Sequence, residues 1–356
     1  AIDADPENKE FRQEFEELSE LNTLMSKGIR SMKNGDIDNA FESFRVAYEK
    51  FPQYPESVFN MGLANFRNKD YDEAVNYFKK TIAINPDHKN ALTAIKNVAK
   101  NFFNKGNQLY KRGDLEGALS SYDEVLNVDK TFYQAHFQIG VIQSKMGNKD
   151  LAVGSYEKSI QINPQFYKAF FALGLAKSSM NDTEGALESL QKAIDIYPGY
   201  DKAYGAMGDI YIQQKDFDSA KQTLKMATTV NPNYSKGYAN LGVIYSEEEN
   251  WNQAISSLEM AVALNERDAM SFFRLSGAHN MNGDCDSALD AARKSTELKN
   301  RFGGAWFELG IAEWCNGSGN KAGALNAFEK ARGDRAWRKM AEYEIDKVKN
   351  PQKYVK

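Results

Sequence analysis

Small residues recur along the chain at intervals of 34 positions, each inside a run of apolar residues spaced three and four apart. That spacing is typical of amphipathic helices, and a fixed period of this length is typical of a repeat architecture. The interval lengthens once, between the second and third members of the series. The small-residue column comprises Gly28, Gly62, Gly106, Gly140, Gly174, Gly208, Gly242, Ser276 and Gly310.

Three further columns keep a constant distance from the small residue. Alanine follows twelve residues later at Ala40, Ala74, Ala118, Ala152, Ala186, Ala220, Ala254 and Ala288, and two residues late at Ala324. A large apolar residue comes four positions after the alanine, at Phe44, Phe78, Tyr122, Tyr156, Leu190, Leu224, Leu258 and Phe328, with Ala292 as the exception. Five of the eight prolines share one position: Pro52, Pro86, Pro164, Pro198 and Pro232.

These columns predict a helical hairpin. A small residue on the first helix and alanine on the second allow the two helices to approach closely. The large residue lies one turn from the alanine on the same face, so it fills the seam. Proline ends the second helix, and pairs such as Gly35-Asp36 and Gly113-Asp114 make the turn and cap the next helix.

The pattern resembles the tetratricopeptide repeat, whose signature runs through an aromatic residue, Leu-Gly, Tyr, Ala, Phe and Pro. The sixth unit matches it at Tyr204, Met207, Gly208, Tyr211, Ala220, Leu224, Ala227 and Pro232. The resemblance implies an all-α fold, a right-handed α-α superhelical solenoid of nine tandem hairpins with N- and C-terminal capping helices. Lys130, Glu266, Asn300 and Ala336 depart from the pattern at the proline position.

The domain organisation predicted from these features has three parts. Residues 1–20 are an acidic N-terminal helical segment, residues 21–338 are nine repeats, and residues 339–356 are a capping helix and tail. Residues 89–98 are extra and helix-compatible, which predicts a lengthened first helix in the third repeat.

The N-terminal segment is distinctive in charge. Residues 1–20 carry eight acidic residues against Lys9 and Arg12, a net charge of −6, and Asp5-Pro6 suits a helix start. Phe11, Phe15 and Leu18 follow helical spacing. Two interpretations are open: a structural cap, or a segment that binds a partner or a second copy of the chain.

The resemblance also implies which side chains line the concave face. Counting the small residue as position eight, positions 2, 5, 6, 9, 12 and 13 point inward. Position five holds Phe59, Phe103, Phe137 and Phe171, with Phe273 and Phe307 in later repeats. Other columns already supply core residues, so this stripe is expected to be partly exposed and to anchor a partner. The alternative is that these rings pack against the neighbouring first helix.

Amide side chains accompany the stripe at position six, at Asn60, Asn104, Gln138 and Asn240. They resemble the asparagine ladder that clamps an extended peptide in the array of the O-linked N-acetylglucosamine transferase. A carboxamide offers both a donor and an acceptor, which match a peptide unit regardless of sequence. Arg274 and Glu308 interrupt the ladder in later repeats, and solvated surface amides are the alternative.

Basic residues at position 13 include Lys111 and Lys145. A basic row beside an apolar stripe suits an acidic amphipathic segment of a partner protein. A row of solvated lysines is the alternative.

Composition narrows the function classes. The net charge of −4 over 356 residues carries no clustered basic excess, so nucleic acid is not an expected partner. No apolar run is long enough to predict a membrane span. The three histidines lack metal-ligand spacing, and no phosphate loop, dinucleotide motif or nucleophile elbow occurs. We therefore expect no cofactor, no metal and no catalysis.

The two cysteines, Cys285 and Cys315, fall at helix ends that should meet within adjoining hairpins. A disulfide and a pair of buried thiols are both open. A disulfide would favour an oxidising compartment, and the first residue, Ala1, also favours processing, so a periplasmic or secreted location is expected, with the cytoplasm as the alternative.

The favoured function is a protein-interaction scaffold whose concave groove holds a peptide or helix of a partner within a larger assembly. One alternative is an architectural subunit of a membrane-associated complex that docks by its outer surface. Another is the recruiting array of a larger enzyme.

Overall fold

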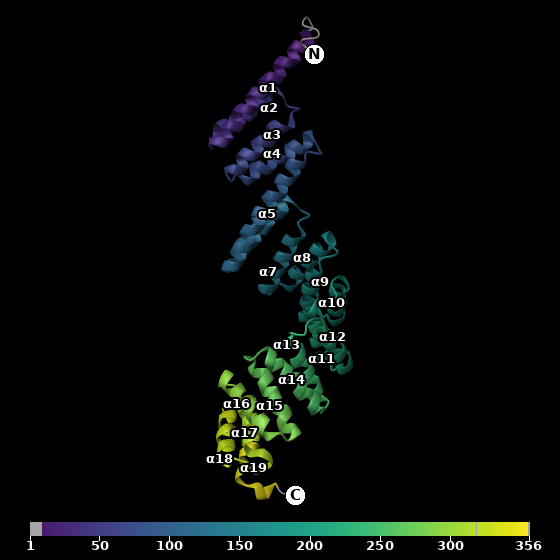
Figure 1. The fold of residues 1–356 in the computed structure, drawn as a ribbon, viewed down its shortest axis with the longest axis vertical. Coiled ribbons are helices and arrows are strands. Elements are labelled where there is room, and N and C mark those ends of the chain that lie inside the picture. The colour runs from purple at the N-terminus through teal and green to yellow at the C-terminus, as the bar shows by residue number, and fades with distance from the viewer. Residues whose placement is uncertain (1–8, 318, 355–356) are drawn as a thin grey trace. The chain divides into compact units, whose positions relative to one another are not determined.

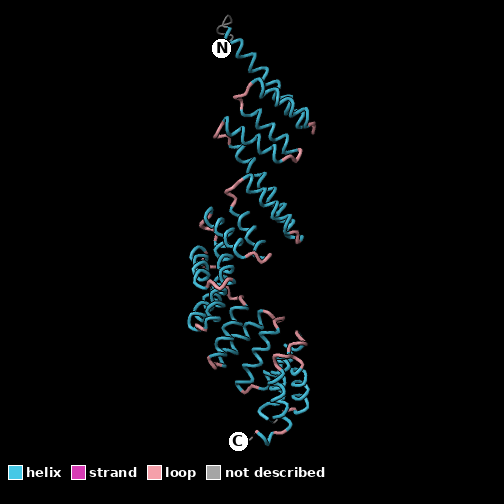
Figure 2. The backbone as a smooth tube through the Cα atoms, turned by 180° about the vertical axis from the view of Figure 1, so that it is seen from behind, coloured by secondary structure: helices cyan, strands magenta, loops and turns pink. Residues whose placement is uncertain are grey.

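The computed structural model describes residues 9–317 and 319–354, and within them the backbone consists of helices joined by short loops (Figure 2). The all-α prediction is confirmed for this part of the chain. The predicted helix start at Asp5-Pro6 and the acidic residues at positions 3, 5 and 7 lie outside the described residues.

The chain divides into two compact units, residues 1–164 and residues 165–356. In unit 1, consecutive helices pack in pairs as hairpins, visible as the purple to teal ribbons of Figure 1. Its helices are α1 (Lys9–Asn34), α2 (Ile37–Lys50), α3 (Pro55–Arg67), α4 (Tyr71–Ile84), α5 (Lys89–Arg112), α6 (Leu115–Val128), α7 (Tyr133–Lys145) and α8 (Lys149–Ile162).

Unit 2 continues the same pairing and ends with an additional helix. Its first helices are α9 (Tyr167–Ser179), α11 (Asp201–Gln214), α13 (Ser235–Glu247), α15 (Ala269–Asn282) and α17 (Gly303–Trp314). Its second helices are α10 (Thr183–Ile196), α12 (Phe217–Val230), α14 (Trp251–Leu264), α16 (Cys285–Leu298) and α18 (Lys321–Arg332). The remaining elements are α19 (Arg338–Lys349) and the 3-10 turns η1 (Cys315–Gly317) and η2 (Pro351–Lys353).

The small-residue column lies under the large residue of the second helix. A Cβ atom placed on Gly62 would lie 2.5 Å from the ring of Phe78, and one on Gly310 would lie 2.5 Å from the ring of Phe328. Both rings are fully buried. A side chain at these glycines would force the two helices of the hairpin apart, which explains the column.

The turns inside the hairpins follow the predicted chemistry. Gly35, Gly113 and Gly283 have φ near +80°, the left-handed conformation that glycine adopts without strain. The aspartates that follow them begin the second helices, and each accepts a hydrogen bond from a backbone N–H three residues on. Helix starts and hairpin turns are therefore specified locally.

The extra residues 89–98 form the first turns of α5, which has 24 residues. His88 caps this helix, since its Nδ1 accepts the Ala91 N–H at 3.1 Å. Ala91 and Val98 are fully buried and pack in one cluster with Phe78. The added turns therefore enlarge the core of unit 1.

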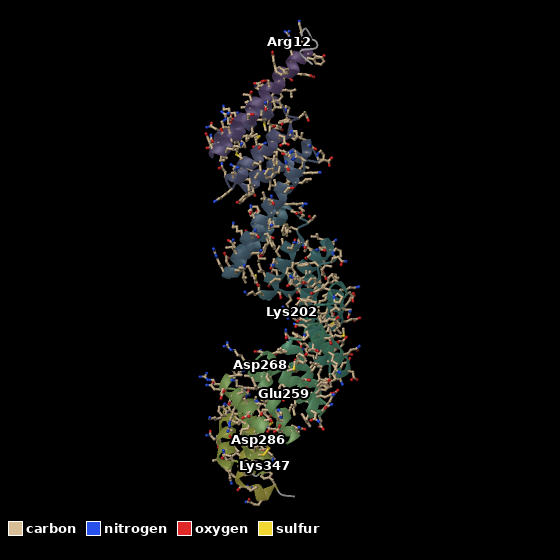
Figure 3. The ribbon with its side chains drawn as sticks, in the orientation of Figure 1. Arg12, Lys202, Glu259, Asp268, Asp286 and Lys347 are labelled. Atoms are coloured by element: carbon tan, nitrogen blue, oxygen red, sulfur yellow. A yellow bond between two sulfur atoms is a disulfide. The ribbon has the colours of Figure 1, made fainter. Side chains whose placement is uncertain are left out.

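Helix α1 runs without interruption from Lys9 to Asn34, so the predicted boundary at residue 20 coincides with no helix end. Its first turns, where Figure 3 labels Arg12, extend past α2. Phe15 and Leu18 are 60% and 65% exposed there, whereas Leu21 and Met25 further along are buried. Helix α1 therefore joins the core of unit 1 through its later turns.

At the other end, α19 covers the last hairpin. Ala341, Ile345 and Val348 are buried against α18 in one cluster with Phe328. Such a helix shields the apolar face that the final repeat of an array would otherwise expose.

A disulfide joins Cys285 to Cys315, whose Cα atoms are 5.6 Å apart. Cys285 is the first residue of α16 and Cys315 caps the end of α17. The bridge therefore links the last two hairpins of unit 2.

Candidate functional site

The phenylalanines at position five pack against the residue that caps the next first helix. The centroid distances are 5.0 Å for Phe59–His88, 5.1 Å for Phe103–Phe132, 5.0 Å for Phe171–Tyr200 and 4.9 Å for Phe273–Phe302. Several of these rings also contact the large residue of their own hairpin, as in Phe59–Phe78, Phe103–Tyr122, Phe137–Tyr156 and Phe307–Phe328. The column therefore contributes to packing within and between hairpins.

This packing corrects the expectation of partial exposure at one member of the stripe, Phe59. Phe59 is only 9% exposed, so the prediction that it is an accessible anchor is wrong. Phe103, Phe137 and Phe171 are partly buried. The physical reason is that the Phe59 ring packs between Phe78 of its own hairpin and His88, which caps the next first helix.

Two of the four predicted ladder amides are engaged within the fold. Asn60 donates from Nδ2 to the carbonyl oxygen of Glu56 at 2.7 Å, one turn back on its own helix. Asn240 donates to Asp209 at 2.5 Å, and Asp209 also receives the ammonium of Lys236 at 2.6 Å. Each of these amides therefore uses one of its two N–H donors within the fold.

The other two amides keep solvent contact. Asn104 is exposed and lines a pocket of about 620 Å³ with Lys69, Asp70 and Lys105, beside the α3–α4 turn. Gln138 is partly exposed on α7. The four amides therefore differ in their surroundings: Asn60 and Asn240 donate hydrogen bonds within the fold, whereas Asn104 and Gln138 keep solvent contact.

Lys111 and Lys145 are both exposed in unit 1. The ammonium of Lys145 lies 5.3 Å from the centroid of the Tyr110 ring, a cation–π contact that brings the end of α7 beside Lys111. Arg67, from the same column, instead donates to the carbonyl oxygen of Met32 at 2.7 Å and caps α1. The basic column therefore mixes a structural cap with two solvent-facing cations.

Unit 2 contains a pocket of about 500 Å³ on its first helices, here called the Glu308 pocket. Helices α13, α15 and α17 form its walls, with contributions from the start of α14 and from α19. Most lining residues occupy positions 5, 6, 9, 12 and 13, which the repeat pattern assigned to the concave face. The residues used below are Trp251, Phe273, Arg274, Gly277, Phe307 and Glu308.

Glu308 is the central polar group of this pocket. Asn280 donates from Nδ2 to its Oε2 at 2.7 Å and to its backbone oxygen at 3.1 Å. Burial raises the pKa of Glu308 to about 7, and the Asn280 hydrogen bond opposes that rise only in part. The carboxyl is thus desolvated and held in place by a neutral donor.

The other charged residues that line the pocket are Glu247, Arg274 and Glu344. Burial lowers the pKa of Arg274, while the nearby charge of Asp268 acts in the opposite direction. Glu344 is buried and pairs with Lys347 at 3.3 Å. Within the described residues, no cation is in ion-pair contact with Glu308.

Gly277 opens the space above the Glu308 carboxyl. A Cβ atom at this position would lie 3.5 Å from the carboxyl carbon, which is ordinary van der Waals contact. The equivalent positions in the other repeats carry side chains: Ile29, Leu63, Asn107, Val141, Leu175, Asp209, Val243 and Ile311. This single glycine at position nine was the sequence signal that could have identified the pocket.

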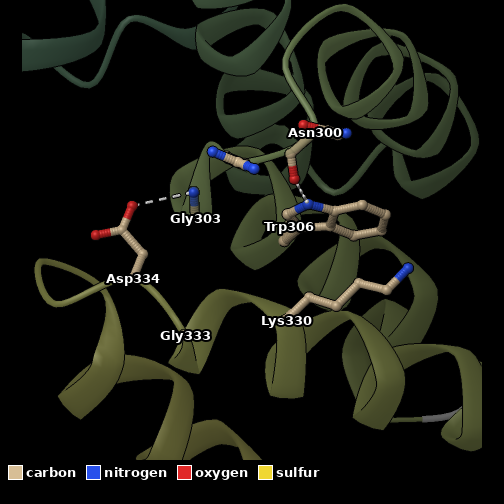
Figure 4. A pocket seen from close by; sticks show the side chains of 7 residues that line it. Asn300, Gly303, Trp306, Lys330, Gly333 and Asp334 are labelled. Atoms are coloured by element: carbon tan, nitrogen blue, oxygen red, sulfur yellow. Dashed lines mark hydrogen bonds between the residues drawn. The ribbon is translucent and has the colours of Figure 1, made fainter.

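A second pocket in unit 2, of about 610 Å³, has its polar groups satisfied by the chain itself (Figure 4). The Trp306 indole N–H donates to the Asn300 carbonyl oxygen at 2.7 Å, and the Lys330 ammonium lies 3.8 Å from the ring centroid. Asp334 accepts the N–H of Gly303 at 3.1 Å, which fills the N-terminus of α17. These contacts join successive hairpins and engage Trp306, Lys330 and Asp334 within the chain.

Neither a metal site nor a membrane-spanning helix is found where the structure describes the chain. No group of three or more potential metal-ligating side chains occurs among these residues. Their helices are also too short or too polar to cross a bilayer.

Family models place much of the sequence among known repeats. Models described as tetratricopeptide repeat match residues 55–88, 133–166, 178–241 and 238–270, and one described as TPR repeat matches residues 106–147. The TPR repeat-containing protein MJ1428 of Methanocaldococcus jannaschii is 26% identical over 162 residues, which cover 34% of this chain and 29% of that protein. The chain spans less than a third of the length of the curated relatives it matches.

Solved structures agree in fold. PilF of Pseudomonas aeruginosa aligns with a TM-score of 0.53 at 17% identity, covering 58% of this chain and 94% of that one. The Cut9–Hcn1 hetero-tetramer of the APC/C aligns with a TM-score of 0.51 at 14% identity, covering 92% of this chain and 76% of that one. Together with the hairpin columns and their packing, the family-model matches show that the chain belongs to the tetratricopeptide repeat superfamily.

Proposed function

We propose that this chain is a protein-interaction scaffold that binds a peptide or helix of another protein on the first-helix surface of its repeats, as part of a larger assembly. The observation that carries the proposal is the Glu308 pocket, whose aromatic and charged lining comes from the positions assigned to the concave face. A concave site with apolar walls and a few convergent polar groups is typical of a binding site.

In unit 1, the exposed Lys111 and Lys145 support a complementary proposal, that an acidic part of the partner lies near the ends of α5 and α7. The disulfide in unit 2 supports a periplasmic or secreted location, because such bridges persist in oxidising compartments.

A second copy of the chain is a further proposed partner. Phe15 and Leu18 stand exposed on the part of α1 that extends past α2, among Glu14, Glu17 and Glu20. An apolar row of this kind suits association with another apolar surface. We propose that these turns of α1 contact a second copy.

Hydrogen exchange with the partner purified from the native source tests the scaffold proposal. Binding on the proposed surface would slow exchange in first helices, α15 and α17 above all, and leave the exposed faces of second helices unchanged. Protection confined to second helices would instead support an architectural subunit that docks by its outer surface, and it would refute the groove proposal.

A further inference from the structure

The Glu308 pocket combines a carboxyl group that lacks a counter-ion with aromatic walls. Phe273 and Phe307 line it from α15 and α17, and Trp251 lines it from the start of α14. The faces of such rings attract cations. The pocket therefore offers a basic side chain both a carboxyl group for its charge and aromatic rings for a cation–π contact.

The electrostatic environment of Glu308 explains why a cation would be bound. A buried carboxylate is costly unless a positive group or several donors compensate for lost hydration. Asn280 supplies one neutral donor to the carboxylate, and the described residues supply no ion pair. A ligand ammonium or guanidinium would complete the site.

Arg274 shares the wall of the pocket, and its charge must be considered. The carboxylate that acts on it is that of Asp268, which also caps α15 through the N–H of Met270 at 3.0 Å. The pKa of Glu308 is set by its burial and by the Asn280 hydrogen bond. Among the described residues Arg274 makes no ion pair with Glu308, so it does not serve as the counter-ion of this carboxyl.

Access to the carboxyl depends on Gly277. The nearest atoms to a Cβ placed at this position all belong to the Glu308 side chain, at 3.5 to 3.7 Å. A large side chain there would cover the carboxyl and fill part of the pocket. Leu63 and Leu175 occupy the equivalent position in other repeats, so the fold accommodates leucine at this place.

From this geometry we propose that the Glu308 pocket binds a basic side chain, lysine or arginine, of the partner protein. Glu308 is the counter-ion, Asn280 positions its carboxyl, and Phe273, Phe307 and Trp251 contact the aliphatic stem and the cation. The inference rests on the proposed function, because it names the side chain that the first-helix surface selects.

The test uses the full chain, isotope-labelled for NMR, and four capped amino acids as probes: the Nα-acetyl methylamides of lysine, arginine, norleucine and glutamate. We expect the lysine and arginine probes to shift the resonances of Gly277 and Glu308 saturably. Norleucine, which matches lysine in length without its charge, and glutamate should bind about tenfold more weakly or not at all, a difference that corresponds to one modest ion pair.

Two variants localise the effect. Glu308→Gln keeps the shape and the acceptor for Asn280 and should weaken the lysine probe about tenfold, as should Gly277→Leu, which covers the carboxyl. Gly154→Leu is the matched control, because Gly154 is also helical and a Cβ atom added to it would have no neighbouring atom within 4 Å. It should leave probe binding unchanged. Backbone resonances of α15 and α17 verify that each variant is folded.

Other outcomes overturn the inference separately from the proposed function. Equal binding of norleucine would make the pocket merely apolar, and preferential binding of glutamate would make Arg274 the anchor. Unchanged lysine binding in Glu308→Gln would also refute it. In each case, slower hydrogen exchange in α15 and α17 with the natural partner bound would still support the scaffold proposal. If the natural partner does not slow exchange in these helices, the scaffold proposal itself is refuted.

Discussion

The hydroxyl of Ser276 donates a hydrogen bond to the carbonyl oxygen of Ala288, 2.8 Å away on the second helix of the same hairpin. Ser276 stands where the other repeats have glycine, and this hairpin is also the exception in the large-residue column, where it carries Ala292. Both side chains are fully buried. The larger residue on α15 thus accompanies the smaller residue on α16, and the Ser276 side chain occupies part of the space that the large residue fills in other hairpins.

This exchange predicts non-additive stability effects. Ser276→Gly removes the hydrogen bond and leaves space beside Ala292, which should cost about 1–2 kcal/mol of unfolding free energy. Ala292→Leu places a branched side chain against Ser276 and should cost about 1–3 kcal/mol by overpacking. The double variant restores the pattern of the other repeats. Urea unfolding should show that it loses less unfolding free energy than the two single variants lose together. If the two losses simply add, residues 276 and 292 do not compensate for each other.

Glu308 predicts a pH dependence of stability with a definite sign. Burial raises its pKa from 4.5 to about 7 in the folded state. Between these values the folded chain holds a proton that the unfolded chain has released, so the free energy of unfolding falls as pH rises. At about 1.4 kcal/mol per pKa unit, the loss approaches about 3 kcal/mol above pH 7.

Glu308→Gln removes this titration and retains an acceptor for Asn280. The variant should therefore match the parent near pH 4 and exceed it by up to about 3 kcal/mol near pH 8.5, as measured by denaturant unfolding. The charged neighbours Arg274, Glu344 and Lys347 are common to both proteins and cancel in the difference. Glu342→Gln, at an exposed position of α19, is the control and should show no such divergence. An equal difference at both pH values would refute the raised pKa.

Phe59 is predicted to stabilise the fold of unit 1. Its ring is buried between Phe78 and His88, so Phe59→Ala should cost about 3–5 kcal/mol by loss of buried area and creation of a cavity. Phe15→Ala, at an exposed position, should change the unfolding free energy by about 0.5 kcal/mol or less. A Phe59→Ala protein of unchanged stability would show that the ring is not part of the core.

The sequence predicted the hairpins well because their determinants are local and repeated. The close approach of Gly62 to Phe78 recurs at a fixed separation in almost every repeat, and the aspartate caps lie beside the helices they start. The packing of Phe59 on His88 was harder to predict, because the capping residue belongs to the next repeat and changes among histidine, phenylalanine and tyrosine.

The candidate site depended on information that no single column contains. Glu308, Asn280 and Glu344 come from three helices, and only their packing reveals that Glu308 is desolvated. In the sequence, Arg274 and Glu308 only interrupt the series of amide residues at position six. In the folded chain Glu308 lies below the gap at Gly277, which makes it the central group of a pocket.

The disulfide predicts sensitivity of unit 2 to reductant. The bridge closes a segment of 30 residues, and the chain-entropy relation for a loop of this length gives about 3–4 kcal/mol. Reduction should therefore lower the urea midpoint of the unit 2 transition, followed by the fluorescence of its tryptophans. The double variant Cys285→Ser/Cys315→Ser should unfold at the same lower midpoint with and without reductant. A parent protein unaffected by complete reduction, verified by intact mass, would contradict a stabilising bridge.

Helix α1 predicts an association that is separable from stability. Phe15 and Leu18 contribute little to the core because 60% and 65% of their surfaces remain exposed, so Phe15→Ser/Leu18→Ser should leave the melting temperature nearly unchanged. If these residues contact a second copy, light scattering should show the parent chain as a dimer at high concentration and the variant as a monomer. Leu151→Ser, at an equally exposed leucine of α8, is the control and should remain dimeric. A parent chain that stays monomeric at every concentration would refute self-association through α1 and leave its exposed row to a different partner.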